Sequence, residues 1–393
     1  MRARQMALAL LALGGSLASG CGVGYELPTE RPAGRTVPGD QSYQMVATWT
    51  GMDGVRDILL TQGAATQLFI LFSSSNLEDT CSGGGPDVPR GEVRLYPLKA
   101  GTGIPTPIDA SYFRPLQRLF DPIALTSAQN RLFVLDQGDS CLARPIQTGV
   151  GAGVIRDLRA TWRVREYDLT GGDTLSTFTD TTLAAVTGIA AGTDGAIYVS
   201  GTAIILDTLQ TDTRIRTRVF ASRVRRYKRG PRYPGVVPND VTMPGASWHR
   251  DTTWVIRSGS GNASVSDPRG LYFSRLGTGS LFIADRGNDQ VKQVSVAVPG
   301  LGFVQVDGQE TGANFNAPVD VTADLQNFFY VVDRQNRRVL RYDGAGQFVQ
   351  RLDVEPDAQG LSLLDPVAVA VDDTLAYIAD RGRAKVMRYR RRQ

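Results

Sequence analysis

One apolar pattern recurs along this chain and constrains its fold more than any other feature. Six short segments carry it: TQLFILF (66–72), NRLFVLD (130–136), GAIYVSG (195–201), GSLFIAD (279–285), NFFYVVD (327–333) and TLAYIAD (374–380). The aspartates that end the last three, Asp285, Asp333 and Asp380, lie 48 and 47 residues apart. A fixed period of this length predicts a repeat architecture, in which each unit buries its apolar face against its neighbours.

Each copy is flanked by further short apolar segments. The preceding ones are GVRDILL (54–60), DPIALTS (121–127), AAVTGIA (184–190), DPRGLYF (267–273), APVDVTA (317–323) and DPVAVAV (365–371). A third segment with Val or Leu and often Tyr follows each copy, and a fourth completes the unit, as in 252–259, 302–308 and 346–354. These runs are β-branched or aromatic and are bounded by Gly, Pro, Asp or Asn, which is typical of strands. Four short strands recurring about every 47 residues predict β-propeller blades.

The number of blades follows from the two ends of the repeat. The sixth unit stops after its third strand, KVMRYRRRQ, whereas an isolated strand, SYQMVATWTG (42–51), precedes the first unit. We therefore expect an all-β fold of six four-stranded blades, in which the N-terminal strand completes the last blade. Such closure removes the exposed sheet edges that an open stack would leave.

The later units resemble NHL repeats. The resemblance is carried by LDPVAVAVDDTLAYIADRGRAKVMRY and FNAPVDVTADLQNFFYVVDRQNRRVLRYDGAGQFVQRL; it is good over residues 263–392 and degenerate over 54–230. NHL propellers bind proteins or RNA, or carry an enzyme active site. The resemblance therefore implies a fold and leaves the activity open.

The N-terminus predicts export. Arg2 and Arg4 precede a short apolar run and a stretch of small residues, so residues 1–20 are predicted to be a signal peptide. The stretch ends in Cys21 and resembles a bacterial lipobox, which implies lipidation of this cysteine and export to the outer membrane. Ala18 departs from the lipobox pattern, and ordinary cleavage after Ala18 is the alternative.

Three segments are expected in the exported chain. Residues 21–41, rich in Gly, Pro and polar residues, are predicted to be a flexible tether behind the lipid, and residues 42–393 the propeller. The other two cysteines, Cys81 and Cys141, are predicted to form a disulfide, with free thiols as the alternative. We expect a monomeric lipoprotein in the periplasm or outer membrane, or at the cell surface, held to the membrane by its lipid alone.

A polar corner follows the repeated strand. Asp136, Asp285, Asp333 and Asp380 share its first position, and the later corners continue as Arg-Gly-Asn, Arg-Gln-Asn and Arg-Gly-Arg. Asp and Asn accept hydrogen bonds from nearby backbone N–H groups, and Gly permits a positive φ. Because the corner obeys the repeat, we interpret it as a turn former; metal binding is the alternative.

A second recurrent group precedes the first strand of three blades: Asp121, Asp267 and Asp365, each followed by Pro. Asp-Pro marks a turn and sets an extended start to the strand. In a propeller these carboxylates surround one mouth of the central channel, so they are also the alternative ligands for a divalent metal. No cofactor is expected otherwise.

The repeat fails in the links between second and third strands of the first three units, at 73–91, 137–161 and 201–222. Long loops on a rigid scaffold often carry function. The third link leads into an arginine-rich ribbon, a candidate binding surface made of Arg214, Arg216, Arg218, Arg223, Arg225 and Arg226. The predicted export disfavours nucleic acid and favours an acidic partner; a merely solvated ribbon is the alternative.

No catalytic constellation is evident in the sequence. The single histidine, His249, cannot supply a site of several histidine ligands, and no G-x-S-x-G motif occurs. We therefore predict a non-catalytic, surface-anchored propeller that acts as a binding or scaffolding module for a protein or an envelope glycan. The alternative is a metal-dependent, lactonase-like hydrolase or lyase with carboxylate ligands at the channel mouth.

Overall fold

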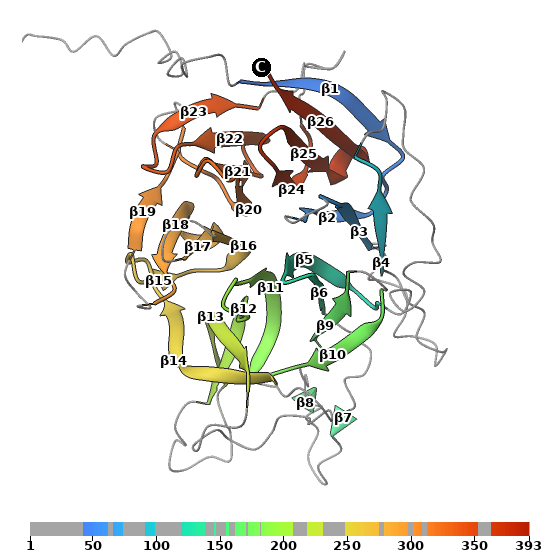
Figure 1. Ribbon diagram of the computed structural model, residues 1–393. Coiled ribbons are helices and arrows are strands. Elements are labelled where there is room, and N and C mark those ends of the chain that lie inside the picture. The colour runs from blue at the N-terminus through green and yellow to red at the C-terminus, as the bar shows by residue number, and fades with distance from the viewer. Residues whose placement is uncertain are drawn as a thin grey trace, which may run out of the picture. The chain divides into compact units, whose positions relative to one another are not determined.

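Six antiparallel β-sheets form a ring around a central channel (Figure 1). The computed structural model describes residues 42–61, 66–73, 91–98, 119–137, 145–146, 155–156, 162–169, 172–180, 182–206, 218–230, 248–274, 279–297, 302–308, 313–352 and 363–392. They belong to one unit, Gly34–Gln393. Helical structure in the described ranges is confined to two short 3-10 turns, η3 (Arg286–Asn288) and η5 (Arg381–Arg383). The predicted all-β, six-bladed propeller is confirmed.

The strand innermost in each blade is the first that the chain enters. These six are β2 (Val55–Leu60), β5 (Pro122–Ala128), β11 (Leu183–Ala191), β16 (Pro268–Ser274), β20 (Pro318–Ala323) and β24 (Pro366–Val371). The repeated apolar pattern forms the second strands: β3 (Leu68–Ser73), β6 (Arg131–Asp136), β12 (Ile197–Leu206), β17 (Ser280–Asp285), β21 (Phe329–Asp333) and β25 (Leu375–Asp380). The second strands are almost entirely buried because sheets pack against both of their faces.

The outer strands complete the blades. The third strands are β4 (Gly91–Tyr96), β9 (Arg163–Asp168), β13 (Arg218–Arg229), β18 (Gln290–Ser295), β22 (Arg338–Tyr342) and β26 (Lys385–Arg391). The fourth are β10 (Thr174–Phe178), β14 (Trp248–Ser258), β19 (Gly302–Val306), β23 (Phe348–Arg351) and β1 (Tyr43–Thr50). A short parallel strand, β15 (Ser264–Val265), extends blade 3, and β7 (Pro145–Ile146) pairs with β8 (Ile155–Arg156). In the described part of the chain, blade 1 has three strands.

The N-terminal strand closes the ring, as predicted. β1 pairs antiparallel with β26 at the outer edge of blade 6, from Tyr43 opposite Arg391 to Thr50 opposite Lys385. Trp49 of β1 is fully buried and stacks on Tyr96 of blade 1, with ring centroids 6.0 Å apart. The first strand of the domain therefore joins the last blade to the first.

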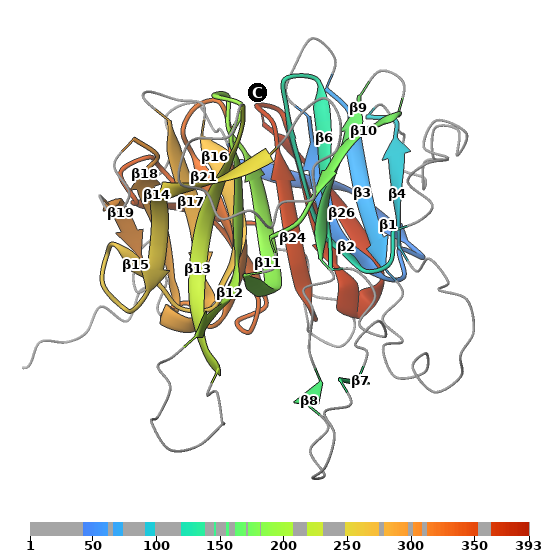
Figure 2. The same ribbon diagram turned by 90° about the horizontal axis from the view of Figure 1, so that it is seen from below.

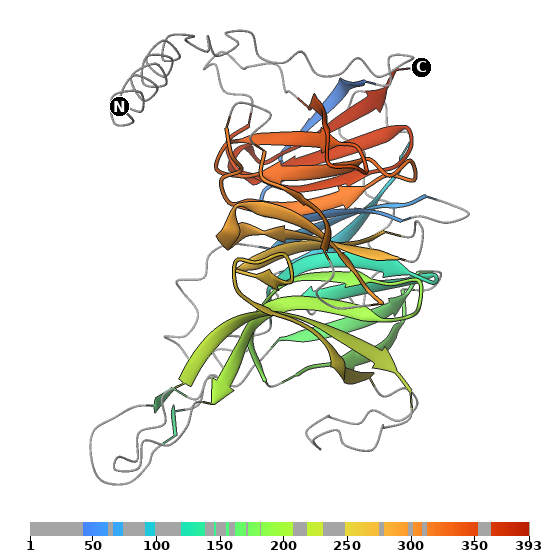
Figure 3. The same ribbon diagram turned by 90° about the vertical axis from the view of Figure 1, so that its left-hand side faces the viewer.

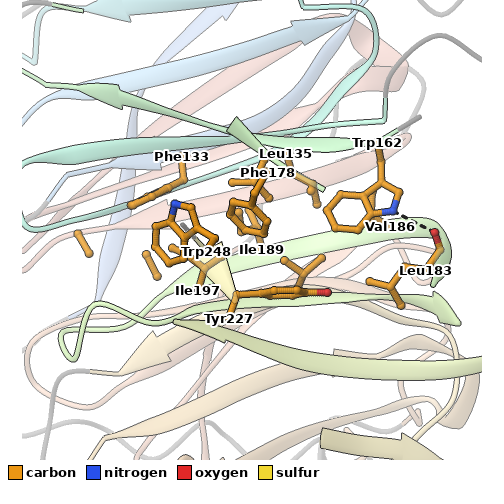
Figure 4. Close-up of a cluster of buried hydrophobic side chains, with 14 of the residues drawn as sticks. Phe133, Leu135, Trp162, Phe178, Leu183, Val186, Ile189, Ile197, Tyr227 and Trp248 are labelled. Carbon is orange, nitrogen blue, oxygen red and sulfur yellow. Dashed lines mark hydrogen bonds between the residues drawn. The ribbon is translucent and has the colours of Figure 1, made fainter. Parts of the chain in front are cut away.

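The core consists of six apolar clusters, one for each interface between neighbouring blades. Figure 4 shows the cluster between blades 2 and 3, where Trp162, Phe178, Tyr227 and Trp248 pack together. The indole N–H of Trp162 donates to the carbonyl of Leu183 at 3.0 Å. Since every blade buries both faces in this way, no single blade is expected to be stable alone.

Blade 3 differs from the prediction. Its second and third strands remain paired from Ile197 opposite Tyr227 to Leu206 opposite Arg218, so the hairpin enters the predicted link 201–222 (Figures 2 and 3). The segment that was predicted to be a loop contains Thr202, Ile204 and Ile205, which favour strands and allow the ladder to continue.

Candidate functional site

The corner aspartates, Asp136, Asp285, Asp333 and Asp380, are fully buried. Each accepts backbone N–H groups from the segment that leads into the innermost strand of its own blade. Asp285 accepts the N–H of Ser266 at 2.6 Å, and Asp380 accepts those of Leu364 and Asp365 at 2.9 and 2.8 Å. These bonds give the corner aspartates the structural role that the repeat predicted.

The glycine of the corner has a different role from the predicted one. The left-handed residues are Asp289 (φ 52°), Arg337 (φ 53°) and Ala384 (φ 50°), four positions after the aspartate. Gly287 instead lies so close to the preceding segment that a Cβ there would be 2.8 Å from the carbonyl oxygen of Ser266. Close approach, and not positive φ, therefore explains this glycine.

Arginines lie beside all three carboxylates of the Asp-Pro pairs, but only Asp267 and Asp365 form close ion pairs with them. Asp365 binds Arg334 at 2.5 Å and Arg381 at 2.7 Å, and these guanidinium groups hold its pKa below its usual value against the opposing effect of burial. Asp267 binds Arg286 at 2.7 Å and Arg269 at 3.1 Å. Asp121 accepts the hydroxyl of Ser73 at 2.9 Å, and Arg56 lies 3.9 Å away. The mouth of the channel is thus rich in arginines, which outnumber the three carboxylates.

The channel itself is a cavity of about 120 Å³ lined by the six innermost strands. A bulge interrupts the pairing of every innermost strand near its start, as between Val55 and Asp57 or between Pro318 and Asp320. Two carboxylates, Asp57 and Asp320, lie at these bulges and are called the channel aspartates below. Ala124, Gly270 and Ala368 occupy the corresponding bulge positions of β5, β16 and β24.

Each channel aspartate joins its blade to the next one. Asp57 accepts the N–H of Ile58 at 2.8 Å and that of Leu125 in blade 2 at 2.6 Å. Asp320 accepts the N–H of Val321 and that of Val369 in blade 6, both at 2.9 Å. The carboxylates therefore satisfy backbone groups that the bulges leave outside the ladder.

Burial in the channel raises the pKa of Asp57 to about 7, although its two backbone hydrogen bonds oppose the rise. Burial, followed by the nearby charge of Asp57, raises the pKa of Asp320 well above its usual value. Desolvation disfavours a carboxylate, and two carboxylates close together disfavour each other's ionisation. The pair consequently holds at least one proton over much of the acidic and neutral range.

The described part of the arginine ribbon of blade 3 is largely engaged with other groups of the protein. Arg225 is buried and binds Asp180 at 2.7 Å, whereas the neighbouring Arg226 binds Asp251 at 2.6 Å and lies over the ring of Trp254. Arg223 donates to the carbonyl of Ser222 and to the hydroxyl of Ser258. Arg214 and Arg216 lie outside the described residues, as does the side chain of Arg218. The predicted binding surface stays a prediction.

A second cavity, of about 330 Å³, lies between blades 2 and 3 at the end of the innermost strands away from the arginine-rich mouth. The carboxylate of Glu166, which is 1% exposed, lines it together with Arg131 and Arg229, both of which form ion pairs with that carboxylate. The indole N–H of Trp248 donates to Ser176 at 3.1 Å. The charged groups of this cavity therefore have partners within the protein.

Several predicted features fall outside the described residues: the signal segment 1–20, the tether 21–41 with Cys21, and both Cys81 and Cys141. In the described ranges, no group of three or more His, Cys, Asp or Glu residues is arranged to hold a metal ion. The same ranges contain no helix long and apolar enough to span a membrane.

Comparisons with known proteins add little to what the fold shows. No protein-family model matches the chain, and no curated protein matches it. Among solved structures, the chain is similar to the crystal structure of a "putative gluconolactonase", with 12% sequence identity, a TM-score of 0.46, and coverage of 90% of this chain and 93% of that chain. The arrangement of the sheets therefore defines the class of protein, a six-bladed β-propeller.

Proposed function

We propose that this protein is a non-catalytic binding or scaffolding propeller of the bacterial cell envelope, anchored by a lipid on Cys21, and that its partner is a protein or an envelope glycan. The propeller supplies a rigid ring, and the loops at the arginine-rich mouth supply the recognition surface.

The pairing of the mouth carboxylates carries this proposal. A metal-dependent hydrolase or lyase would need Asp121, Asp267 and Asp365 as ligands, yet Asp365 is held by two guanidinium groups and Asp267 by two others. A divalent cation would have to displace these cationic groups before it could bind. Arginines that outnumber the carboxylates favour an acidic ligand over a metal ion.

Thermal unfolding tests the choice between the two functions. The purified propeller is melted after EDTA treatment and again after addition of Ca²⁺ or Zn²⁺, with Mg²⁺ at the same ionic strength as the control. A ligand that binds the folded state raises its stability. Because we expect no metal to bind, the unfolding midpoints should lie within about 1 °C of one another. A rise of several degrees with one metal would contradict the proposal and favour the metal-dependent enzyme.

The anchor is tested separately. Cys21→Ala should move the protein from the membrane fraction to the soluble fraction, because the lipid would be its only attachment. A variant that stays with the membrane would contradict lipidation at this residue. Mass spectrometry without reductant should find the peptides of Cys81 and Cys141 joined, and free thiols at both would contradict the disulfide.

A further inference from the structure

We propose that the channel mouth where blades 1, 5 and 6 meet binds an oxyanion, a carboxylate or phosphate group of the ligand, through Arg56. The proposal rests on the proposed binding function and adds the chemistry of the group that is bound. Arg56 lies on β2 and lines the channel, next to the ion pairs of Arg334 and Arg381.

Arg56 has an incomplete set of partners. Its side chain is 19% exposed, and its Nε atom is buried with no hydrogen-bond partner among the described residues. Its Nη2 atom lies 3.9 Å from the nearer carboxylate oxygen of Asp121, beyond hydrogen-bond distance. Asp121 itself accepts the hydroxyl of Ser73. A guanidinium group offers five N–H donors, so Arg56 retains donors for a ligand.

The charges around Arg56 do not balance. Arg334 and Arg381 both bind Asp365, and each contacts it with two nitrogen atoms. In the described part of this mouth, three arginines thus share two carboxylates. Burial lowers the pKa of Arg56, and the positive charges of Arg381 and Arg334 lower it further against the opposing effect of Asp121. A guanidinium stays charged in proteins, so this destabilisation is one that a bound anion would relieve.

Arg269 provides an internal comparison. It follows Pro268 at the start of β16, the position that corresponds to Arg56 in β2, and also faces the channel mouth. Arg269, however, binds Asp267 at 3.1 Å and 3.2 Å with one nitrogen atom. The difference in pairing predicts that Arg56, and not every arginine of the ring, binds the anion.

The walls next to Arg56 restrict what can enter. Ile123 and Val367, from the innermost strands of the two neighbouring blades, line the same cavity, and its volume of about 120 Å³ accommodates an acidic group and a few more atoms. The larger part of the ligand would remain outside, at the surface formed by the loops of this mouth. The site therefore suits the acidic end of a larger molecule, such as a uronic acid, an acidic side chain or a phosphorylated sugar.

The experiment is a titration of the intact propeller with sodium phosphate and with sodium glucuronate, followed by calorimetry and by thermal unfolding. Sodium chloride at matched ionic strength is the control. We expect saturable binding of at least one anion in the millimolar range, reduced at least tenfold in Arg56→Met and unchanged in Arg269→Met. Stronger response to glucuronate indicates a carboxylate ligand, and stronger response to phosphate indicates a phosphorylated one.

Asp121→Asn distinguishes a binding role of Arg56 from a structural one. This variant removes the carboxylate that competes for Arg56, so anion affinity should rise about three- to tenfold. A purely structural ion pair predicts lower stability without tighter binding. Circular dichroism identifies variants that fail to fold, and in that case Arg56→Lys, which keeps the charge, should bind more weakly than the wild type.

Two results would overturn the inference: equal anion binding by the wild type and Arg56→Met, or no gain in Asp121→Asn. Neither result would affect the broader proposal of a binding module, which could use other groups in the loops of this mouth. That broader proposal fails if a divalent metal raises the unfolding midpoint by several degrees, whatever the anions do.

Discussion

Two sets of aspartates in this propeller behave differently. The corner aspartates recur in four blades, whereas the channel aspartates occur in blades 1 and 5 alone among the described bulges. Both sets accept backbone N–H groups, but Asp285 also binds Lys292 at 2.8 Å and Asp333 binds Arg338 at 2.6 Å, within the blade. The channel aspartates reach into the next blade, and burial raises their pKa values.

The repeated aspartates of this fold have a structural role, whereas the aspartates outside the repeat have an unusual proton affinity. The corner aspartates, which recur in four blades, accept backbone N–H groups of their own blade, and Asp285 and Asp333 form ion pairs within it. The channel aspartates, which are outside the repeat, face the channel where the blades meet. Their proton affinity depends on burial by residues that are far away in sequence. The channel aspartates therefore set blades 1 and 5 apart from the other blades.

The largest expected effect is the loss of a corner aspartate. Asp285→Ala removes the acceptor of the Ser266 N–H and leaves Lys292, whose side chain is 2% exposed, without its carboxylate. Breaking a buried ion pair in this way should lower the free energy of unfolding by about 3–5 kcal/mol in urea denaturation.

Two variants control this prediction. Adding Lys292→Met to Asp285→Ala should recover part of the loss, because no unpaired ammonium group then remains in the core. Asp343→Ala, in a turn where the carboxylate accepts the N–H groups of Ala345 and Gln347, should cost about 1 kcal/mol. Equal losses for Asp285→Ala and Asp343→Ala would remove the distinction between a corner and an ordinary turn.

The channel aspartates should make stability fall as pH rises. The pKa of Asp57 is raised to about 7 in the folded state, so the unfolded chain loses this proton first. The stability that comes from the protonated Asp57 is fully present below the unfolded-state pKa of about 4. It is lost as the pH rises towards the folded-state pKa of about 7. Between about pH 5 and about pH 7, the free energy of unfolding should decline by on the order of 2 kcal/mol.

Asp57→Asn should remove the part of that decline due to Asp57 in urea denaturation at several pH values, and adding Asp320→Asn should remove the part due to Asp320. The chain has one histidine, so few other side chains titrate in this interval. A wild-type slope that persists in the double variant would contradict the assignment.

A smaller effect is expected where the corner contacts the segment that leads into the innermost strand. Gly287→Ala would place a Cβ 2.8 Å from the carbonyl oxygen of Ser266, and the backbone would have to shift. The variant should lose about 1–3 kcal/mol, the usual range for overpacking. Gly261→Ala, whose Cβ would lie 3.7 Å from its nearest neighbour, should be close to neutral in the same measurement.

The sequence predicted the architecture because the repeat is expressed in every blade. The strand pattern, the six blades and the closure by residues 42–51 follow from alternation, turn residues and the unmatched strand at each end. The structural role of Asp285 was predictable for the same reason. The role of Gly287 was not, since close approach to Ser266 depends on how two distant segments pack.

The candidate site was missed for a related reason. Asp57 and Asp320 appear in GVRDILL and APVDVTA as single polar residues within strands, a pattern that is common on half-exposed sheets. Their one signal was the difference from the Ala and Gly at the matching positions of other blades. That Asp57 and Asp320 influence each other across blade 6, and that Arg56 meets Arg334 and Arg381, follows from ring closure and from no local motif.

The smallest expected effect concerns the left-handed residue at the end of the corner. Ala384 has φ 50° and ψ 48°, a left-handed conformation that costs a non-glycine residue roughly 1 kcal/mol, so Ala384→Gly should raise the free energy of unfolding by about 0.5–1 kcal/mol. Asp289 has the same conformation in blade 4, but its carboxylate accepts the N–H of Ala317 at 2.8 Å. Asp289→Gly loses that bond between blades and should not stabilise. If both variants stabilise equally, the bond to Ala317 contributes nothing, and the corners differ from blade to blade less than their hydrogen bonds indicate.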